Sequence, residues 1–207
     1  NGTLNAIGNV SNPITFNFDD TSLGIRLKQN STSILDYLVI NDAKSGITIT
    51  QAVSEIRHIT ALNCKFGIHI ANENYASGHS SIEYVTLTNN NYGLWLSNSS
   101  PSFLHNEVTG SNKGVYCSNF SSPSLAQSYY VDGDNHITDN TYGVYAYANS
   151  NPTLGHYDPY NPYNNYGFNT IINNSSYHLY AEQYCTILAA NNWWGSNPPN
   201  TALFYSG

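Results

Sequence analysis

A four-residue pattern that returns seven times constrains the fold of this 207-residue chain more than any other feature. In each copy an anchor residue is followed by an apolar residue, a residue expected to face outward, and a second apolar residue. The anchors are Gly24, Gly46, Gly67, Gly93, Gly114, Gly143 and His178. Their basic spacing is 21 to 22 residues, lengthened by insertions. A fixed period of this size predicts a solenoid, in which each repeat packs on its neighbours.

Apolar residues inside each unit recur at every second position, which is the period of a β-strand. A second strand is expected before each anchor, with inward residues such as Leu38 and Ile40. A third short strand is expected near Ile34, Ile56, Ile82, Phe103, Leu125 and Leu154. Three short strands per unit predict an all-β fold, a parallel β-helix of about seven to eight rungs of ~21–22 residues, as one domain over residues 1–207.

Residues at the expected corners suggest how one rung joins the next. The anchor glycines are interpreted as tight turns that need a positive φ. Asn three residues before the anchor recurs at Asn90, Asn140 and Asn192, and these amides are predicted to stack as one ladder at a corner, which Cys64 interrupts. Trp193 and Trp194 are expected to cover the open apolar end of the stack.

Composition excludes several classes of protein. Only 9% of the residues are charged, and the regular apolar positions favour a packed core over disorder. The net charge is −7, so the basic footprint of a nucleic-acid-binding protein is missing. A transmembrane helix is not expected, because no run of ~18 apolar residues occurs. Without Met or a signal peptide, the chain is interpreted as a mature or excised part of a longer secreted protein.

The repeat resembles the right-handed parallel β-helix units of secreted bacterial surface proteins and polysaccharide-active enzymes. The resemblance covers about residues 12–195. It includes the first-rung motif Asn12-Pro13-Ile14-Thr15-Phe16 and the closing motif Asn191-Asn192-Trp193-Trp194-Gly195. It implies a right-handed β-helix and a secreted or cell-surface location. It does not select an activity, because this fold carries lyases, hydrolases, binding modules and adhesive stalks.

The outward position two residues after the anchor forms a column that ends in four aromatic residues. It reads Arg26, Thr48, His69, Trp95, Tyr116, Tyr145 and Tyr180. Aromatic rings can stack on a pyranose, and tyrosine hydroxyls can bond to its hydroxyls, so Trp95, Tyr116, Tyr145 and Tyr180 are candidate ligand contacts. The alternative is that the stacked rings only support the sheet. A Tyr-rich insertion supplies three further candidates, namely Tyr157, Tyr160 and Tyr163.

A second outward column lies nine residues before the anchors. It reads Tyr37, His58, Tyr84, His105 and Asp134, flanked by Asp36, Arg57 and Glu83. The alternating charges predict ion pairs between neighbouring rungs. The alternative is a polysaccharide lyase site. There Arg57 would neutralise a uronate carboxylate, and His58 or Tyr84 would abstract the C5 proton.

The acidic residues Asp132, Asp134 and Asp139 are a candidate Ca²⁺ site, with a capped turn as the alternative. Apart from Ca²⁺ no cofactor is expected. No trio of aspartates on consecutive rungs, as hydrolases of this fold need, can be aligned.

These observations predict a non-catalytic β-helix module of a secreted or cell-surface protein, structural or adhesive, that contacts a polysaccharide or cell-surface glycan through its aromatic columns. The alternative is a lyase or hydrolase domain that acts on an acidic polysaccharide. Ice binding is disfavoured, because the Thr48 and Thr50 pair does not continue in register. Self-association through the ends of the β-helix is also expected, since exposed strand edges can pair with another copy.

Overall fold

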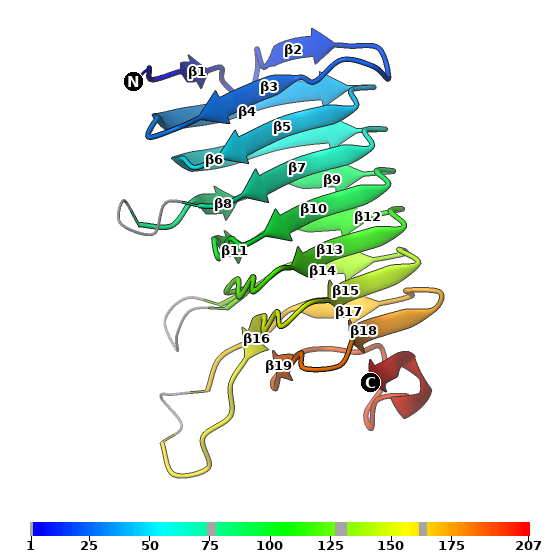
Figure 1. Ribbon diagram of the computed structural model, residues 1–207. Coiled ribbons are helices and arrows are strands. Elements are labelled where there is room, and N and C mark those ends of the chain that lie inside the picture. The colour runs from blue at the N-terminus through cyan, green and yellow to red at the C-terminus, as the bar shows by residue number, and fades with distance from the viewer. Residues whose placement is uncertain (1, 74–77, 127–131, 162–164) are drawn as a thin grey trace.

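The computed structural model describes residues 2–73, 78–126, 132–161 and 165–207. It is a parallel β-solenoid of about seven turns, with the N-terminus at one end of the stack and the C-terminus at the other (Figure 1). The all-β prediction and the expected number of turns are therefore confirmed. Within the described ranges, no helix is long and apolar enough to cross a membrane.

The larger sheet has ten strands and contains the strands that precede each anchor. Its strands are β1 (Asn5–Ile7), β2 (Ile14–Asn17), β4 (Thr32–Asn41), β6 (Val53–Leu62), β8 (Ser81–Glu83), β9 (Thr86–Thr88), β11 (Ser102–Leu104), β12 (Glu107–Thr109), β14 (His136–Thr138) and β17 (Thr170–Ile172). All of their named pairings are parallel, for example β4 with β6 and β12 with β14.

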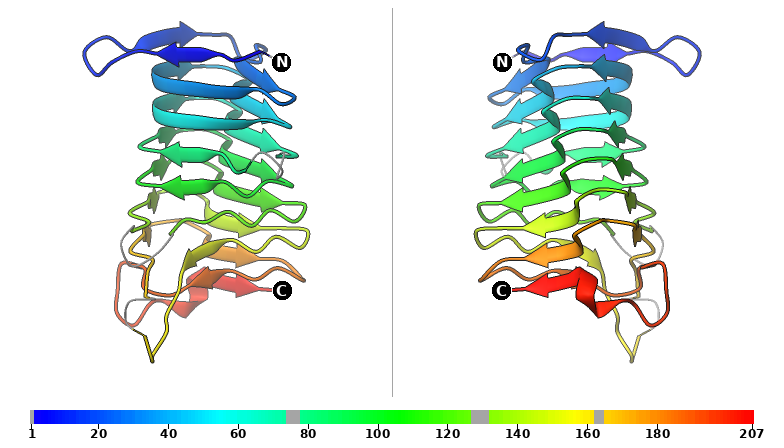
Figure 2. Two further views of the ribbon diagram at one scale, coloured as in Figure 1. Left: turned by 90° about the vertical axis from the view of Figure 1, so that its left-hand side faces the viewer. Right: turned by 90° about the vertical axis from the view of Figure 1, so that its right-hand side faces the viewer.

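The second sheet has eight strands and carries the repeated pattern. Its strands are β3 (Ile25–Lys28), β5 (Ser45–Thr50), β7 (Phe66–Ala71), β10 (Tyr92–Ser97), β13 (Lys113–Ser118), β15 (Tyr142–Ala146), β18 (Tyr177–Ala181) and β20 (Phe204–Ser206). A small third sheet pairs β16 (Thr153–Gly155) with β19 (Leu188–Ala189). The side views in Figure 2 show these strands stacked turn upon turn along one axis.

The core lies between the sheets and is built by the predicted inward residues. None of the fourteen residues at positions one and three after the anchors is more than 8% exposed. The predicted inward residues before the anchors are buried too, including Leu38, Ile40, Val85 and Leu87. These predictions are confirmed, because a strand with one buried face needs an apolar residue at every second position.

One predicted strand register is wrong by one residue. Leu35, which is fully buried, pairs with Ile56, whereas Ile34 pairs with Glu55 and is 36% exposed. The second and third strands of this turn are one continuous ten-residue strand, β4, which bends at Tyr37. Tyr37 has a φ of 53°, and this left-handed residue resets the alternation of inward and outward side chains.

The predicted positive φ of the anchor glycines is wrong for five of the six. Of the six, only Gly24 has a positive φ. The others lie where the backbone of the next turn comes too close for a side chain. A Cβ on Gly46 would lie 2.6 Å from the carbonyl oxygen of Gly67, and a Cβ on Gly67 would lie 2.6 Å from that of Gly93. His178 can take the place of glycine at the last anchor because β20 does not pair with β18 at that position. The first pair between the two strands is Leu179 with Phe204.

The buried asparagines form two ladders instead of the single predicted one. In the first, Asn140 Nδ2 donates to Asn174 Oδ1 at 3.1 Å, and Asn90 Oδ1 accepts from the backbone N–H of Cys64. In the second, which consists of Asn106, Asn135, Asn169 and Asn192, each amide donates to the next at 2.8–3.1 Å. Asn192 was therefore assigned to the wrong ladder. Both ladders satisfy buried polar backbone groups at the corners.

The C-terminal end of the core is covered by one of the two predicted tryptophans. Trp194 packs against the core, and its ring meets that of Phe204 edge-on at a centroid distance of 4.9 Å. Trp193, by contrast, is 50% exposed. A turn of 3₁₀-helix, Thr201–Leu203, leads into β20 and completes the cap.

Candidate functional site

The predicted outward column lies in register on the eight-stranded sheet. Arg26 pairs with Thr48, Thr48 with His69 and His69 with Trp95. The pairing continues through Tyr116, Tyr145 and Tyr180. The structure adds one member that the sequence analysis missed, since Tyr180 pairs with Tyr205 of β20.

A second column on the same sheet was missed entirely. It occupies the position just before the last five anchors and consists of Phe66, Tyr92, Lys113, Tyr142 and Tyr177. If inward and outward side chains alternated strictly, the residue before the anchor would be buried, because the residue after the anchor is buried. In β7, β10 and β13, however, both the glycine and the following residue are buried, so the residue before the glycine turns outward. The recurring aromatic-glycine pairs were the signal in the sequence.

The two columns contact each other and form one surface, called the aromatic face below. Its members are Phe66, His69, Tyr92, Trp95, Lys113, Tyr116, Tyr142, Tyr145, Tyr177, Tyr180 and Tyr205. The ring centroids of Phe66 and Trp95 are 4.9 Å apart, and those of Tyr177 and Tyr180 are 5.2 Å apart. The face therefore extends across consecutive turns from β7 to β20.

Ring orientation divides the aromatic face into parts. Near the C-terminal end, Tyr145, Tyr180 and Tyr205 are stacked at centroid distances of 4.5 and 4.4 Å, so their ring faces cover one another. In the middle the stack opens, because Trp95 and Tyr116 are 6.1 Å apart and tilted by 41°. Rings in the middle of the face therefore overlap one another less than those at its C-terminal end.

Lys113 is a cation surrounded by tyrosine rings at this opening. Its Nζ lies 4.8 Å from the ring centroid of Tyr145, 5.3 Å from those of Tyr92 and Tyr116, and 5.6 Å from that of Tyr142. These are cation–π distances. Burial lowers the pKa of Lys113, against the opposing effect of the Glu182 carboxylate.

A carboxylate anchors one of the tyrosines next to this lysine. The hydroxyl of Tyr145 donates a hydrogen bond to the Glu182 carboxylate. Burial and this bond both raise the pKa of Tyr145. Burial also raises the pKa of Tyr116 to about 12, so both phenols keep their protons at neutral pH. On the neighbouring turn, Trp95 Nε1 donates to Ser118 Oγ at 3.1 Å, which fixes the indole.

The second predicted column lies at a corner and not on a flat sheet. Tyr37, His58, Tyr84 and His105 all have positive φ, between 48° and 58°. Their rings stack in succession at centroid distances of 4.3, 5.3 and 5.0 Å. The column ends at Asp134, whose carboxylate lies 3.6 Å from His105 and 3.8 Å from His136.

The lyase candidates lie together, and the predicted pairing between neighbouring rungs is found for His58 with Asp36 but not for Arg57. His58 stacks on Tyr84, and its Nδ1 is 2.8 Å from Asp36. Arg57 is paired in register with Asp36 and Glu83, yet its ion pair is with Glu55 of its own strand, at 2.9 Å. The predicted ion pairs of Arg57 between rungs are therefore wrong. The Arg57 guanidinium, which the lyase hypothesis assigned to a uronate carboxylate, is thus already paired with the carboxylate of Glu55.

The Ca²⁺ candidates do not converge. Asp134 lies beside His105, while Asp139 lies beyond the far end of β14. In the described part of the chain, no three His, Cys, Asp or Glu side chains form a group that can hold a metal ion. The structure therefore gives no support to a Ca²⁺ site formed by Asp132, Asp134 and Asp139.

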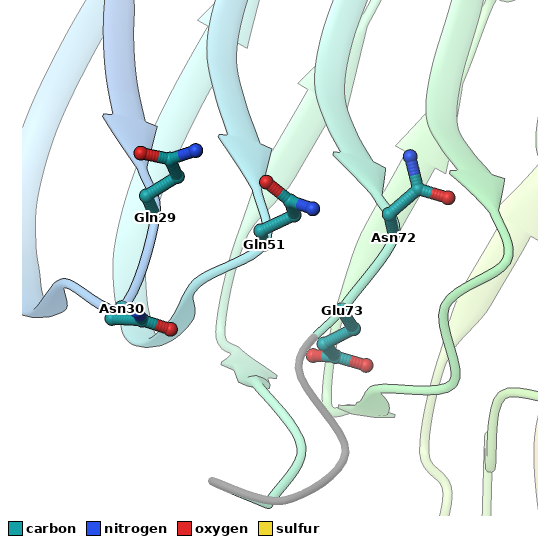
Figure 3. Close-up of a pocket in the computed structure, with 5 residues that line it drawn as sticks. All are labelled: Gln29, Asn30, Gln51, Asn72 and Glu73. Atoms are coloured by element: carbon teal, nitrogen blue, oxygen red, sulfur yellow. The ribbon is translucent and has the colours of Figure 1, made fainter.

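A polar hollow of about 520 Å³ lies beyond the ends of β3, β5 and β7, lined by Gln29, Asn30, Gln51, Asn72 and Glu73. Figure 3 shows the amides of Gln29, Gln51 and Asn72 at the ends of consecutive strands, with Glu73 beside them. The Glu73 carboxylate is buried and accepts the backbone N–H groups of Ser80 and Ser100, at 2.5 and 3.0 Å. These bonds indicate a structural role for Glu73.

The Tyr-rich insertion projects from the stack next to β16 (Figure 1). Tyr157 and Tyr160 are 60% and 95% exposed, and Tyr163 lies outside the described residues. The base of the insertion is closed by an antiparallel bridge between His156 and Tyr166, whose rings lie 5.6 Å apart. Among the described residues, no ring contact joins Tyr157 or Tyr160 to the aromatic face.

Comparison with known proteins bears on the fold and not on the ligand. The family described as "Right handed beta helix region" matches residues 8–156, which is well over half of the chain. No curated protein sequence and no solved structure matches the chain significantly. The match covers the repeats from β2 to β16, where the stacked turns of the structure lie. The chain therefore belongs to the right-handed β-helix family.

Proposed function

We propose that this β-helix is a non-catalytic module of a secreted or cell-surface protein, and that it contacts a glycan through the aromatic face. The observation that carries the proposal is the pair of contacting columns, which place one continuous aromatic surface across consecutive turns. Tyrosine and tryptophan combine apolar ring surface with a hydrogen-bonding group, which matches the apolar faces and polar rims of sugar rings.

The tilted middle of the aromatic face is the expected contact region. Tyr92, Trp95 and Tyr116 lie there at mutual angles of 28–44°, so their rings do not cover one another fully. Two partly buried hydrogen bonds, from Trp95 to Ser118 and from Tyr145 to Glu182, hold these rings in place. A rigid surface loses little conformational entropy when it binds.

The distribution of charge favours an acidic glycan over a neutral one. Although the chain carries a net charge of −7, five of its six basic residues lie on or beside the eight-stranded sheet. They are Arg26, Lys28, Lys44, Lys65 and Lys113. Lys65 adjoins the aromatic face directly, with its Nζ 5.4 Å from the ring centroid of Phe66. Such a local excess of positive charge steers anions to a surface.

A lyase acting at the corner column is the second candidate. The observation that favours it is the contact between His58 Nδ1 and Asp36, which would orient an imidazole base in the way that carboxylates orient catalytic histidines. The ion pair of Arg57 with Glu55 weighs against it.

Titration of the protein with a soluble polyuronate and with a neutral β-glucan tests the binding proposal. We expect Tyr92→Ala and Trp95→Ala each to weaken polyuronate binding about tenfold, the loss of one stacked aromatic contact. Trp193→Ala is the matched control, since it removes an exposed indole outside the face. Tyr157→Ala and Tyr160→Ala report whether the insertion contributes. Thermal unfolding of each variant checks that it is folded.

Two results would overturn the proposal. One is binding that the Tyr92 and Trp95 variants leave unchanged, which would place the ligand elsewhere. The other is release of an unsaturated uronate product from the same polyuronate. Loss of that product in His58→Gln and Arg57→Gln would establish the lyase at the corner column.

A further inference from the structure

The last two members of the aromatic face form the closest ring pair among the described tyrosines. The centroids of Tyr180 and Tyr205 are 4.4 Å apart, and their planes differ by 11°. The next closest pair, Tyr145 and Tyr180, is at 4.5 Å and 27°. Two phenols held in this arrangement are positioned to react with each other.

The pair is also open to reagents in solution. Tyr205 is 41% exposed, and its strand β20 is the last in the eight-stranded sheet. Tyr180 is half-buried beneath it. The inner neighbour Tyr145 differs, because its hydroxyl is bonded to Glu182 and its strand β15 is paired on both sides. The more accessible partner for Tyr180 is therefore Tyr205.

We infer that Tyr180 and Tyr205 are an oxidative modification site, at which a one-electron oxidant of the haem-peroxidase class forms an intramolecular dityrosine. Each phenol loses one electron to the oxidant and one proton to solvent. The two phenoxyl radicals join through one new carbon–carbon bond between the positions ortho to their hydroxyls. The hydrogens on those two carbons move to the phenol oxygens, which restores both rings. Hydrogen peroxide takes up the two electrons and two protons and becomes two water molecules.

Such a bond would fasten the C-terminal cap to the solenoid. β20 pairs with β18 through only three residue pairs, Leu179–Phe204, Tyr180–Tyr205 and Ala181–Ser206. The same short strand holds Phe204, which packs on Trp194 over the end of the core. A covalent link between Tyr180 and Tyr205 closes a loop of 25 residues and thereby restricts the unfolded chain, as a disulfide of similar span does.

The test is to treat the purified full chain, at low concentration, with a haem peroxidase and limiting hydrogen peroxide. Dityrosine fluorescence and mass spectrometry of proteolytic peptides then locate the link. We expect one major product with the mass of the monomer less two hydrogens, joining Tyr180 to Tyr205. Its thermal unfolding midpoint should rise by about 5–10 °C over untreated protein.

Conservative variants separate this site from general tyrosine oxidation. Tyr205→Phe and Tyr180→Phe keep a stacked ring but cannot form a phenoxyl radical, so both should lose the product and the gain in midpoint. Tyr160→Phe is the control for exposure alone, because Tyr160 is 95% exposed, and it should react like the parent. Links found mainly between molecules, or a product that survives in Tyr205→Phe, would overturn the inference. The outcome does not depend on glycan binding.

Discussion

Each interior anchor glycine marks a place where the backbone of the adjacent turn fills the space of a side chain. A Cβ on Gly93 would lie 2.6 Å from the carbonyl oxygen of Gly114 and 2.6 Å from Cγ1 of Val108. Neither atom can move far, because one belongs to a paired strand and the other to the fully buried core. Glycine therefore recurs once per turn because neighbouring turns approach each other too closely there for a side chain.

Gly93→Ala is expected to destabilise the fold by about 2 kcal/mol. The added methyl group has to displace packed backbone and core atoms, the cost of overpacking a well-filled interior. Urea unfolding measures the change in the free energy of unfolding. Gly2→Ala is the control, since nothing lies within 4 Å of the Cβ it would add, and its free energy should match the parent. Equal stability of Gly93→Ala and the parent would refute this account of the anchors.

At the scale of single elements, the ends of the solenoid need protection that interior turns obtain from their neighbours. β18 lies between β15 and β20, whereas within the described residues β20 pairs with β18 alone. Trp194, with Phe204 against it, replaces the missing turn over the apolar core. The adjacent Trp193 extends the backbone ladder, in which its N–H donates to the carbonyl of Asn169, and leaves its indole exposed.

Trp194→Ala should therefore cost about 2–3 kcal/mol of stability, because it uncovers apolar surface and leaves a gap against Phe204. Trp193→Ala changes the same residue type one position earlier, and its cost should stay below about 0.5 kcal/mol, as for most exposed positions. Chemical denaturation of both variants gives the comparison. Similar losses in the two would mean that the cap depends on backbone pairing and not on the indole of Trp194.

At the scale of the whole molecule, the charges are segregated. The net charge is −7, while five of the six basic residues lie on one sheet and its flank. Lys44 and Lys65 occupy the same position in consecutive turns, just before β5 and β7. Repulsion by the molecule as a whole and attraction by this sheet would orient an approaching polyanion toward the aromatic face.

Raising the salt concentration from roughly 0.05 M to 0.5 M should weaken polyuronate binding strongly, since exposed charges are screened over a few ångströms at the higher value. Lys44→Gln combined with Lys65→Gln should reduce the affinity at low salt about fivefold and flatten the salt dependence. Arg57→Gln on the other sheet is the matched control and should behave like the parent. Salt-independent binding by the parent would show that the charge distribution plays no part.

Several features could be predicted from residue order because they depend on contacts within one turn. Residues such as Ile47 and Ile49 alternate with polar neighbours, and that period is sufficient to predict a strand and its buried face. The spacing of the anchors then predicts how many turns stack. The column from Arg26 to Tyr180 followed from the same register and was found in place.

Other features were decided only by the tertiary structure, because they depend on how one turn approaches the next. The close contact at the glycines buries two consecutive residues, and this turns Phe66, Tyr92, Lys113, Tyr142 and Tyr177 outward to complete the aromatic face. Arg57 pairs with Glu55 of its own strand, although the register of the strands places Asp36 and Glu83 directly beside it. The sequence by itself determined the solenoid and one outward column. The separation and angle of neighbouring turns decided which side chains meet, since those distances arise only when the turns pack.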